Sequence, residues 1–224
     1  MSSKPPFVTV VIPAFNAERY ITQAVDSVLR QTCGMFECIV VDDGSKDQTR
    51  SVVERYGPAV RYEFQTNAGP ATARNRGIEL ATGDFVAFLD ADDVWNPDKV
   101  AVQMARFNGH PELVGCAAHV QNFHSEDTDT AAQGQVVTLG TTLLVRRSLF
   151  DAVGLLNPEY WHRDLQDLLV RAEDRGFKTE ILPDVLAQRR IHSNNMSNHR
   201  SGADHLELIA ITRARHARRR AAGA

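Results

Sequence analysis

Short apolar runs and helix-like segments alternate through the first half of the chain. The apolar runs are rich in Val, Ile and Phe, as buried strands are, and the segments between them repeat apolar residues every three or four positions, as helices do. The pattern predicts strands at Val8–Ile12, Phe36–Val41, Val60–Phe64 and Phe85–Leu89, and helices at Ala17–Gln31, Asp47–Tyr56 and Pro70–Ala81. This alternation over short loops predicts a mainly parallel sheet that helices cover on both faces.

The pattern loosens beyond Pro97. The remaining predicted elements are helices at Asp98–Phe107, Leu165–Arg175 and Asp204–Arg220, and strands at Val114–Gln121, Thr141–Val145 and Lys178–Leu182. A polar flexible loop is expected over Ser125–Gln135. Gly176 is expected to end the helix Leu165–Arg175. The chain has no internal repeat and no clear linker, so we expect one fold whose second half has a different role.

The composition is that of a soluble globular domain. Hydrophobic residues make up 43% of the 224 residues, and a net charge of −3 gives no overall attraction to nucleic acid. The three cysteines form no C-x-x-C pair, which argues against a zinc knuckle or a disulfide framework and favours a reducing compartment. Near the N-terminus Pro13 interrupts a short apolar run, so neither a membrane span nor a cleaved signal is predicted. We therefore expect a cytoplasmic protein.

A polar cluster follows each of the first four predicted strands. The clusters read PAFN, DDGSKD, NAGPATARN and DADD, in chain order. Because the carboxyl ends of parallel strands meet at one edge of a sheet, where ligands bind in such folds, the clusters favour one shared site, although loops are polar in any case. The chain contains neither G-x-x-x-x-G-K-[ST] nor G-x-G-x-x-G, which argues against a P-loop NTPase and a standard dinucleotide fold.

Three carboxylates stand within four residues in the stretch FLDADD: Asp90, Asp92 and Asp93. Like charges this close repel one another unless a cation lies among them, and a divalent cation is the simplest partner. Mg²⁺ and Mn²⁺ prefer oxygen ligands, and Mg²⁺ commonly shares its shell with phosphate oxygens. The alternative is a solvated turn at the start of a helix, where Asp is common. The stretch alone does not decide between these two. Carboxylates at several strand ends, in a sheet that resembles a nucleotide-binding one, suggest a Mn²⁺ or Mg²⁺ ion shared with a diphosphate.

Three stretches together resemble one protein family: VTVVIPAFNAERYITQAVDSVLRQT, VVDDGSKDQT and NAGPATARNRGIELATGDFVAFLDADD, over about residues 7–100. The chain resembles the family 2 nucleotide-sugar glycosyltransferases, which have the GT-A fold. The resemblance implies an α/β fold with a Rossmann-like, mainly parallel sheet flanked by helices and a smaller mixed acceptor-side half. Within one GT-A domain, residues 1–97 would form the nucleotide-sugar-binding half and 98–200 the acceptor-side half, followed by a basic C-terminal helix over 201–224.

The resemblance also implies roles for single residues on the donor side. Pro13 and Phe15 would line the base pocket, and Phe15 stands where the family often has Tyr. The other nucleotide-sugar-binding residues would be Asn16, Asp42, Asp43, Arg74, Asn75 and Asp90. Asp43 would accept a hydrogen bond from the base, while Asp90 and Asp92 would form the D-x-D pair that holds the metal and the ribose. An Asx turn at 42–45 and an ordinary helix face at 74–75 are the structural alternatives.

The acceptor side must supply a general base. The family typically has an acidic pair before a helix that reads like D-L-x-x-R, and the corresponding stretch here is WHRDLQDLLVRAEDRG. Matched on Arg171, the usual base position holds Leu165, which departs from the family pattern. We predict Asp164 as the catalytic base with Asp167 as the reserve, and a helix N-cap is the equal alternative for Asp164. In RRIHSNNMS, which resembles the family's R-x-H-x-x-N segment, His192 would contact the metal or the diphosphate.

The expected function is therefore metal-dependent transfer of a sugar, with inversion, from a nucleoside-diphosphate sugar to an acceptor hydroxyl, with a UDP-sugar as the favoured donor. A sugar-nucleotide-binding protein that has lost catalysis is the first alternative, because of Leu165. A nucleotidyltransferase is the second and weaker one. The basic tail at 213–220 suggests weak peripheral contact with anionic lipid at the inner membrane face, although a solvated helix end is the commoner explanation. No nucleic-acid partner is expected.

Overall fold

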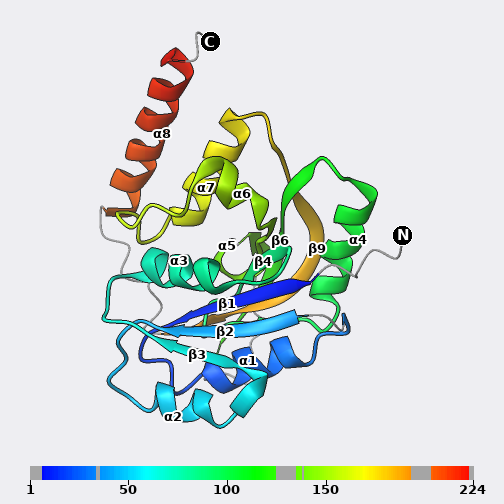
Figure 1. Ribbon diagram of the computed structural model, residues 1–224, viewed down its shortest axis with the longest axis vertical. Helices are drawn as coiled ribbons and strands as arrows, with labels where there is room; N and C mark the ends of the chain where they lie inside the picture. Colours follow the sequence, from blue (N-terminus) through cyan, green and yellow to red (C-terminus); the bar gives the residue numbers. More distant parts are fainter. Residues whose placement is uncertain (1–6, 34–35, 125–134, 138, 193–202, 222–224) are drawn as a thin grey trace.

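The computed structural model describes residues 7–33, 36–124, 135–137, 139–192 and 203–221 (Figure 1). The polar loop predicted over Ser125–Gln135 lies almost entirely outside the described residues. The part of the R-x-H-x-x-N segment that follows His192 lies outside them too.

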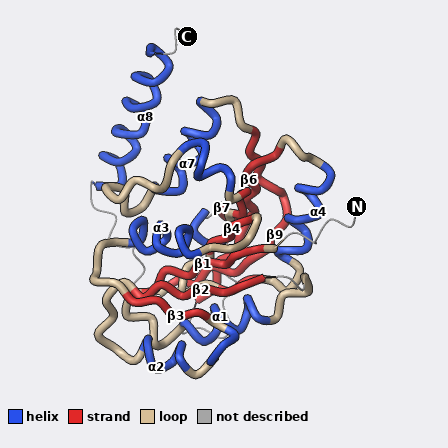
Figure 2. The backbone as a smooth tube through the Cα atoms, in the orientation of Figure 1, coloured by secondary structure: helices blue, strands red, loops and turns tan. Residues whose placement is uncertain are grey.

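Within the described residues, nine strands form one sheet (Figure 2). The strands are β1 (Val8–Ala14), β2 (Phe36–Asp42), β3 (Arg61–Phe64), β4 (Phe85–Phe88), β5 (Val94–Trp95), β6 (Leu113–His124), β7 (Gln135–Val137), β8 (Leu144–Arg146) and β9 (Lys178–Ile191). Their order is β3-β2-β1-β4-β8-β6-β9-β5, with β7 paired to β6. Strands β1 to β4 are parallel, whereas β8 is antiparallel to β4 and β6. The predicted parallel first half and mixed second half are confirmed.

Helices cover both faces of this sheet (Figure 1). They are α1 (Ile21–Leu29), α2 (Thr49–Glu54), α3 (Pro70–Leu80), α4 (Lys99–Gly109), α5 (Leu139–Thr142), α6 (Ser148–Val153), α7 (Asp164–Asp174) and α8 (Ala203–Ala221). Helices α1, α2 and α4 bury apolar side chains against one face, and α3, α6 and α7 against the other. Helix α8 lies on α7 at the outside of the domain. None of the helices in the described part is long and apolar enough to cross a bilayer.

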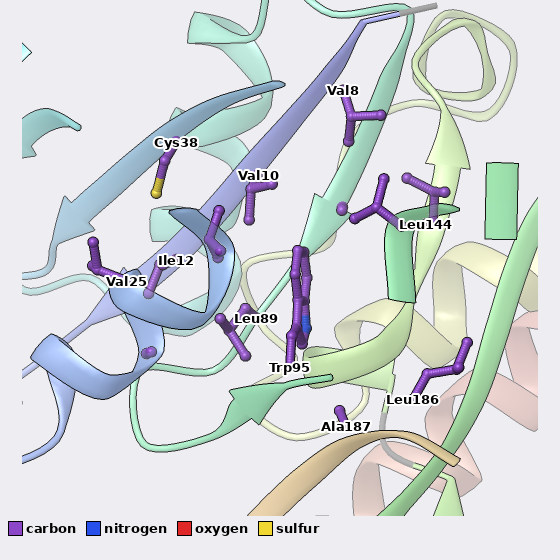
Figure 3. Packing of buried hydrophobic residues seen from close by; sticks show 14 of the residues in the cluster. Val8, Val10, Ile12, Val25, Cys38, Leu89, Trp95, Leu144, Leu186 and Ala187 are labelled. Carbon is purple, nitrogen blue, oxygen red and sulfur yellow. The ribbon is translucent and has the colours of Figure 1, made fainter. Parts of the chain in front are cut away.

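Strand β1 is buried on both faces, which explains its unbroken apolar sequence. Val10 and Ile12 point into the core on the α1 side, whereas Val11 points into the core on the α3 side. Figure 3 shows Val10, Ile12 and Leu89 around the indole of Trp95 in the first of these cores. Trp95 is 2% exposed, and its indole N–H donates to the carbonyl of Thr141 at 2.6 Å, so Trp95 is a packing residue.

Two segments differ from their predicted structure near the polar loops. The helix predicted from Ala17 begins only at Ile21, and before it the N–H groups of Ala17 and Glu18 bond to the side chains of Thr49 (2.8 Å) and Asp47 (3.0 Å). These bonds hold the segment in a turn. The strand predicted from residue 141 begins only at 144, since residues 139–142 form α5.

The last strand is much longer than predicted. The sequence suggested 178–182, but β9 continues to Ile191 and pairs with β6 over most of its length. Pro183 breaks the apolar pattern, and the pairing with β6 shifts register beside it. The polar run Gln188–Arg190 also hides the strand in the sequence.

Candidate functional site

The loops after β1 and β2 are joined by side-chain and backbone hydrogen bonds at the carboxyl edge of the sheet. The N–H of Asn16 donates to the hydroxyl of Ser45 at 2.8 Å, and its side-chain oxygen accepts from the N–H of Lys46 at 2.9 Å. Asn16 adopts a φ of 49°, a region that Asn tolerates better than most residues. Phe15 precedes it with 52% of its surface exposed. The predicted donor residue Asn16 therefore fixes both loops beside an exposed aromatic ring.

The two carboxylates at the end of β2 are buried and have different partners. Asp42 accepts a hydrogen bond from the hydroxyl of Tyr62 at 2.8 Å, and burial together with this carboxylate raises the pKa of Tyr62. Asp43 accepts from the backbone N–H groups of Ala68 and Gly69, both at 2.9 Å. Asp43 thus holds the loop that leads into α3. A contact between Asp43 and a nucleotide base stays a prediction.

Arg74 on α3 connects the donor side of the site to the acceptor side. One guanidinium nitrogen lies 2.8 Å from Asp90 and another lies 2.8 Å from Asp164. The Arg74 side chain is only 6% exposed. Burial disfavours its charge, but the two carboxylates outweigh that effect and raise the pKa of Arg74. Burial also raises the pKa of Asp164, and Arg74 works in the opposite direction. Removing either residue would leave the other charge buried without its partner, which would destabilise the fold.

Two neighbours of Arg74 explain how α3 is held in place. Gly77 faces β1, where an added Cβ would meet Cγ2 of Val11 at 2.8 Å, so only glycine allows this close approach. The amide of Asn75 donates to the carbonyl of Leu156 at 2.8 Å and accepts from its N–H at 2.9 Å. Asn75 therefore anchors the segment between α6 and α7, and its predicted contact with the donor stays a prediction.

The carboxylates that follow β4 point to different partners. Asp90 pairs with Arg74, whereas Asp92 lies 3.0 Å from Nε2 of His192, and both aspartate side chains are 30% exposed. Asp93 is buried and accepts from the N–H of Arg190 at 2.9 Å. Burial, and then the charge of Asp90, raise the pKa of Asp92. The structure thus places three predicted residues, Asp90, Asp92 and His192, at one edge.

Helix α5 supplies two site neighbours that the sequence reasoning missed. An added Cβ on Gly140 would stand 2.7 Å from one carboxylate oxygen of Asp90, so this glycine leaves room for the Asp90 side chain. The hydroxyl of Thr141 bonds to Asp93 and lies 3.5 Å from Asp90. The run of small residues LGTT between two apolar strands was the available signal for both positions.

Helix α7 presents its two predicted acids in different ways. Asp164 is the first residue of α7 and pairs with Arg74. Leu165, at the usual base position of the family pattern, is 3% exposed and belongs to the core on the α3 side. Asp167 pairs with Arg171 at 2.7 Å, and Arg171 also donates to the carbonyl of Leu155 at 3.0 Å. Of the two acids, Asp164 is the one that the structure connects to the donor side, and the catalytic role of either stays a prediction.

No group of three or more His, Cys, Asp or Glu side chains in the described ranges is arranged to hold a metal ion by itself. Asp90, Asp92 and His192 therefore do not form a complete protein-only coordination shell. A shell completed by a ligand would suit them better, because Mg²⁺ is usually bound by one or two carboxylates and phosphate oxygens.

Comparisons with known proteins agree with this arrangement. Residues 9–163 match the family model described as glycosyl transferase family 2. An uncharacterized glycosyltransferase of Rickettsia prowazekii is 32% identical over 216 residues, which cover 86% of this chain and 66% of the relative. The putative teichuronic acid biosynthesis glycosyltransferase TuaG of Bacillus subtilis is 30% identical over 220 residues, which cover 89% of this chain and 85% of the relative. The chain spans about two thirds of the length of the rickettsial relative.

Two solved structures share the fold. S. aureus TarS 1-349 in complex with UDP-GlcNAc superposes with a TM-score of 0.71 at 23% identity, covering 87% of this chain and 61% of that one. The mannosyltransferase PcManGT of Pyrobaculum calidifontis, in complex with GDP-Man and Mn²⁺, has a TM-score of 0.70 at 20% identity, covering 88% and 61%. These likenesses support the GT-A fold that the sequence predicted.

Proposed function

Because the chain belongs to glycosyl transferase family 2, we propose that it is a metal-dependent, inverting glycosyltransferase. The donor is a nucleoside-diphosphate sugar, with UDP-sugars favoured, and the acceptor is a hydroxyl of a glycan, a lipid-linked sugar or a small molecule. The observation that best supports this proposal is the buried Arg74, which pairs with both the partly exposed Asp90 and the buried Asp164. The guanidinium of Arg74 thereby connects the predicted donor side to the predicted base.

Asp90, Asp92 and His192 fit a divalent cation by the chemistry of their donor atoms. Carboxylate oxygens suit Mn²⁺ and Mg²⁺, and imidazole is an acceptable further ligand for transition metals. Burial and the charge of Asp90 raise the pKa of Asp92, so a nearby dication would stabilise its ionised form. When bound, the metal would neutralise charge on the diphosphate leaving group. PcManGT was solved with GDP-Man and Mn²⁺, which supports a divalent metal here.

The proposed donor site uses the loops after β1, β2 and β4. The exposed ring of Phe15 offers a stacking surface for a base, and stacking does not need the hydroxyl that the family often has there. Asp43 accepts hydrogen bonds from the backbone N–H groups of Ala68 and Gly69 and from the side-chain amide of Gln65, so about one of its four acceptor sites is left for a base. A UDP donor is favoured because TarS, a protein of the same fold, was solved with UDP and with UDP-GlcNAc.

In the proposed reaction the acceptor oxygen attacks the anomeric carbon on the face opposite the diphosphate. The new carbon–oxygen bond forms while the bond to the diphosphate breaks, and that electron pair leaves with the diphosphate. Asp164 takes the proton of the acceptor hydroxyl. Burial raises the pKa of Asp164, which strengthens it as a base, and the ion pair with Arg74 opposes this rise by favouring the ionised carboxylate. Arg74 also pairs with Asp90, which fixes the position of the proposed base relative to the proposed metal site.

A donor panel tests this proposal. The protein is incubated with Mn²⁺ and a set of UDP- and GDP-sugars, and release of the nucleoside diphosphate is measured with and without a mixture of acceptor sugars. Slow hydrolysis of one donor, abolished in Asp92→Asn, is expected. Tight donor binding without any turnover would favour the binding protein that has lost catalysis. Pyrophosphate release from a nucleoside triphosphate and a sugar phosphate would favour the nucleotidyltransferase.

We also propose a cytoplasmic location with weak contact to the inner membrane face. The support is the basic end of α8, where Arg213 and Arg220 are exposed. Anionic headgroups attract such residues weakly, at about 1 kcal/mol for each basic side chain near the surface. Co-sedimentation with phosphatidylserine vesicles at low salt, lost at high salt, is the expected result, and equal binding to neutral vesicles would contradict it.

A further inference from the structure

The C-terminal helix α8 contacts both ends of α7. At the first end, the carboxylate of Glu207 accepts hydrogen bonds from three successive backbone N–H groups, those of Trp161 (3.0 Å), His162 (3.1 Å) and Arg163 (3.1 Å). At the other end, Asp174 of α7 pairs with arginines of α8. The helix therefore contacts α7 at its last residue and the backbone just before its first.

One stripe of α8 makes these contacts. Glu207, Ile211, Arg215 and Arg218 lie three or four residues apart, so they share one face of the helix. Ile211 is 2% exposed between the two polar ends. Arg215 and Arg218 lie 3.1 Å and 3.0 Å from Asp174, whose side chain is 6% exposed. The stripe thus forms a packed interface in which the buried Ile211 lies between polar contacts.

The segment that Glu207 holds lies directly before Asp164. Arg163 is the N-cap residue of α7 and its side chain makes no capping bond, whereas its backbone N–H donates to Glu207. Glu207 therefore fixes the backbone that leads into the helix. The carboxylate also lies where a helix N-terminus favours negative charge. The next residue, Asp164, reaches Arg74 at 2.8 Å.

The held segment also touches α3 through Trp161. An added Cβ on Gly69, at the start of α3, would stand 3.2 Å from the indole carbons Cε2 and Cζ2 of Trp161. The segment 161–163 therefore contacts the start of α3, which carries Arg74, and leads directly into Asp164. Movement of this segment would move Asp164 relative to Arg74.

We propose that Glu207 is a positioning residue for Asp164, and that α8 acts on the reaction through it without touching a substrate. This inference rests on the proposed function, because it needs Asp164 to be the base. It predicts that loss of the Glu207 carboxylate lowers turnover and leaves donor binding unchanged.

The test compares Glu207→Ala and Glu207→Gln with the wild-type chain. Glu207→Gln keeps one acceptor oxygen in nearly the same shape, so it is expected to restore part of what Glu207→Ala loses. Ile209→Ala, on the exposed side of the same helix, is the matched control, since Ile209 is 45% exposed. Two quantities are measured: hydrogen exchange of the backbone amides of 161–167, and kcat and KM for the donor identified in the panel.

We expect Glu207→Ala to speed amide exchange in 161–167 and to lower kcat by about tenfold at unchanged donor KM, since misplacement of a catalytic group acts on the reacting geometry. Glu207→Gln should fall between Glu207→Ala and the wild type, and Ile209→Ala should match the wild type. Unchanged exchange in Glu207→Ala would overturn the contact, and faster exchange with full kcat would overturn the positioning role. A wild-type chain without turnover would contradict the proposed function instead, and exchange alone would then decide whether Glu207 holds the segment. If Glu207→Ala does not fold, Glu207→Gln decides by the same two readouts.

Discussion

Arg74 donates a hydrogen bond of 2.8 Å to Asp164, a residue ninety positions further along the chain. The pair is almost fully buried, with side-chain exposures of 6% and 4%. Because a charge buried this deeply needs its partner, the start of α7 and the middle of α3 depend on each other. The family motifs near residue 74 and the acid at 164 are therefore brought together in the folded chain.

Loss of the arginine should destabilise the fold measurably. Arg74→Met leaves Asp164 buried without its cation, and we expect the free energy of unfolding to fall by about 3 kcal/mol. The double variant Arg74→Met, Asp164→Asn should lose less than the sum of the single variants, because the uncompensated charge is gone. Urea unfolding of the four proteins measures this coupling. Additive losses would mean that the two side chains do not interact in solution.

The two acids of α7 should differ in turnover. We expect Asp164→Asn to lower kcat by about a hundredfold, the usual scale for a general base, while donor binding is unchanged. Asp167→Asn should mainly weaken the bond to Arg171 and hence the fold, since Asp167 pairs with that arginine at 2.7 Å. Steady-state kinetics and thermal unfolding of both variants distinguish these effects. Full activity of Asp164→Asn together with an inactive, stable Asp167→Asn would reverse the assignment.

Gly140 should be required for the position of Asp90. In Gly140→Ala the new methyl group meets the Asp90 carboxylate, which must turn away because it is the flexible partner. We expect donor affinity to fall by about tenfold, roughly 1.4 kcal/mol, with little change in stability. Gly109→Ala is the control, since an added Cβ there meets nothing within 4 Å. Calorimetric titration of the donor measures the difference, and equal affinities for both variants would argue against a donor role for Asp90.

The buried Lys99 should make stability depend on pH. Lys99 is 0% exposed, and burial lowers its pKa to about 7 from 10.5. Between these values the unfolded chain binds a proton that the folded chain has released, so stability rises with pH through this window. Below pH 7 Lys99 is protonated in the folded chain as well, so the full cost of burying its charge lowers the stability. Relative to Lys99→Met, the wild type should gain on the order of 3 kcal/mol between pH 7 and pH 10.

Chemical denaturation of both proteins at the two pH values tests this. Lys178→Met serves as the control, because the Lys178 side chain is 70% exposed and should give no such change. A wild type whose stability changes with pH in parallel with Lys99→Met would show that Lys99 stays charged in the fold.

The sequence was most informative where structure is local. Each donor-side cluster follows directly on an apolar strand, so Asp42, Asp90 and Asp92 could be placed at one sheet edge from periodicity and the family motifs. The helix at Asp164 could be placed for the same reason. In contrast, the bond between Asp92 and His192 joins residues one hundred positions apart, and its existence depends on the full length of β9.

Contacts made by tertiary packing left little trace in the sequence. The sequence predicted Thr141 as the first residue of a strand and no role for Gly140, because the short α5 has no helical period to detect. Glu207 is one of two acids in a mainly basic helix, and nothing in its spacing shows that it binds the backbone at 161–163. Such contacts depend on how two distant elements dock, which a single sequence does not encode in local patterns.

The coupling of metal and donor is the most direct test of the site. If Asp90 and Asp92 hold a divalent ion that a diphosphate completes, then UDP and Mn²⁺ must strengthen each other's binding. Titration calorimetry of UDP into the wild type with Mn²⁺ and with EDTA measures this coupling, with Asp92→Asn as the variant that should lose it. We predict at least about tenfold weaker UDP binding in EDTA for the wild type, corresponding to about 1.4 kcal/mol. Equal UDP affinity with and without Mn²⁺ would contradict the assignment of Asp90 and Asp92 as the metal-binding pair.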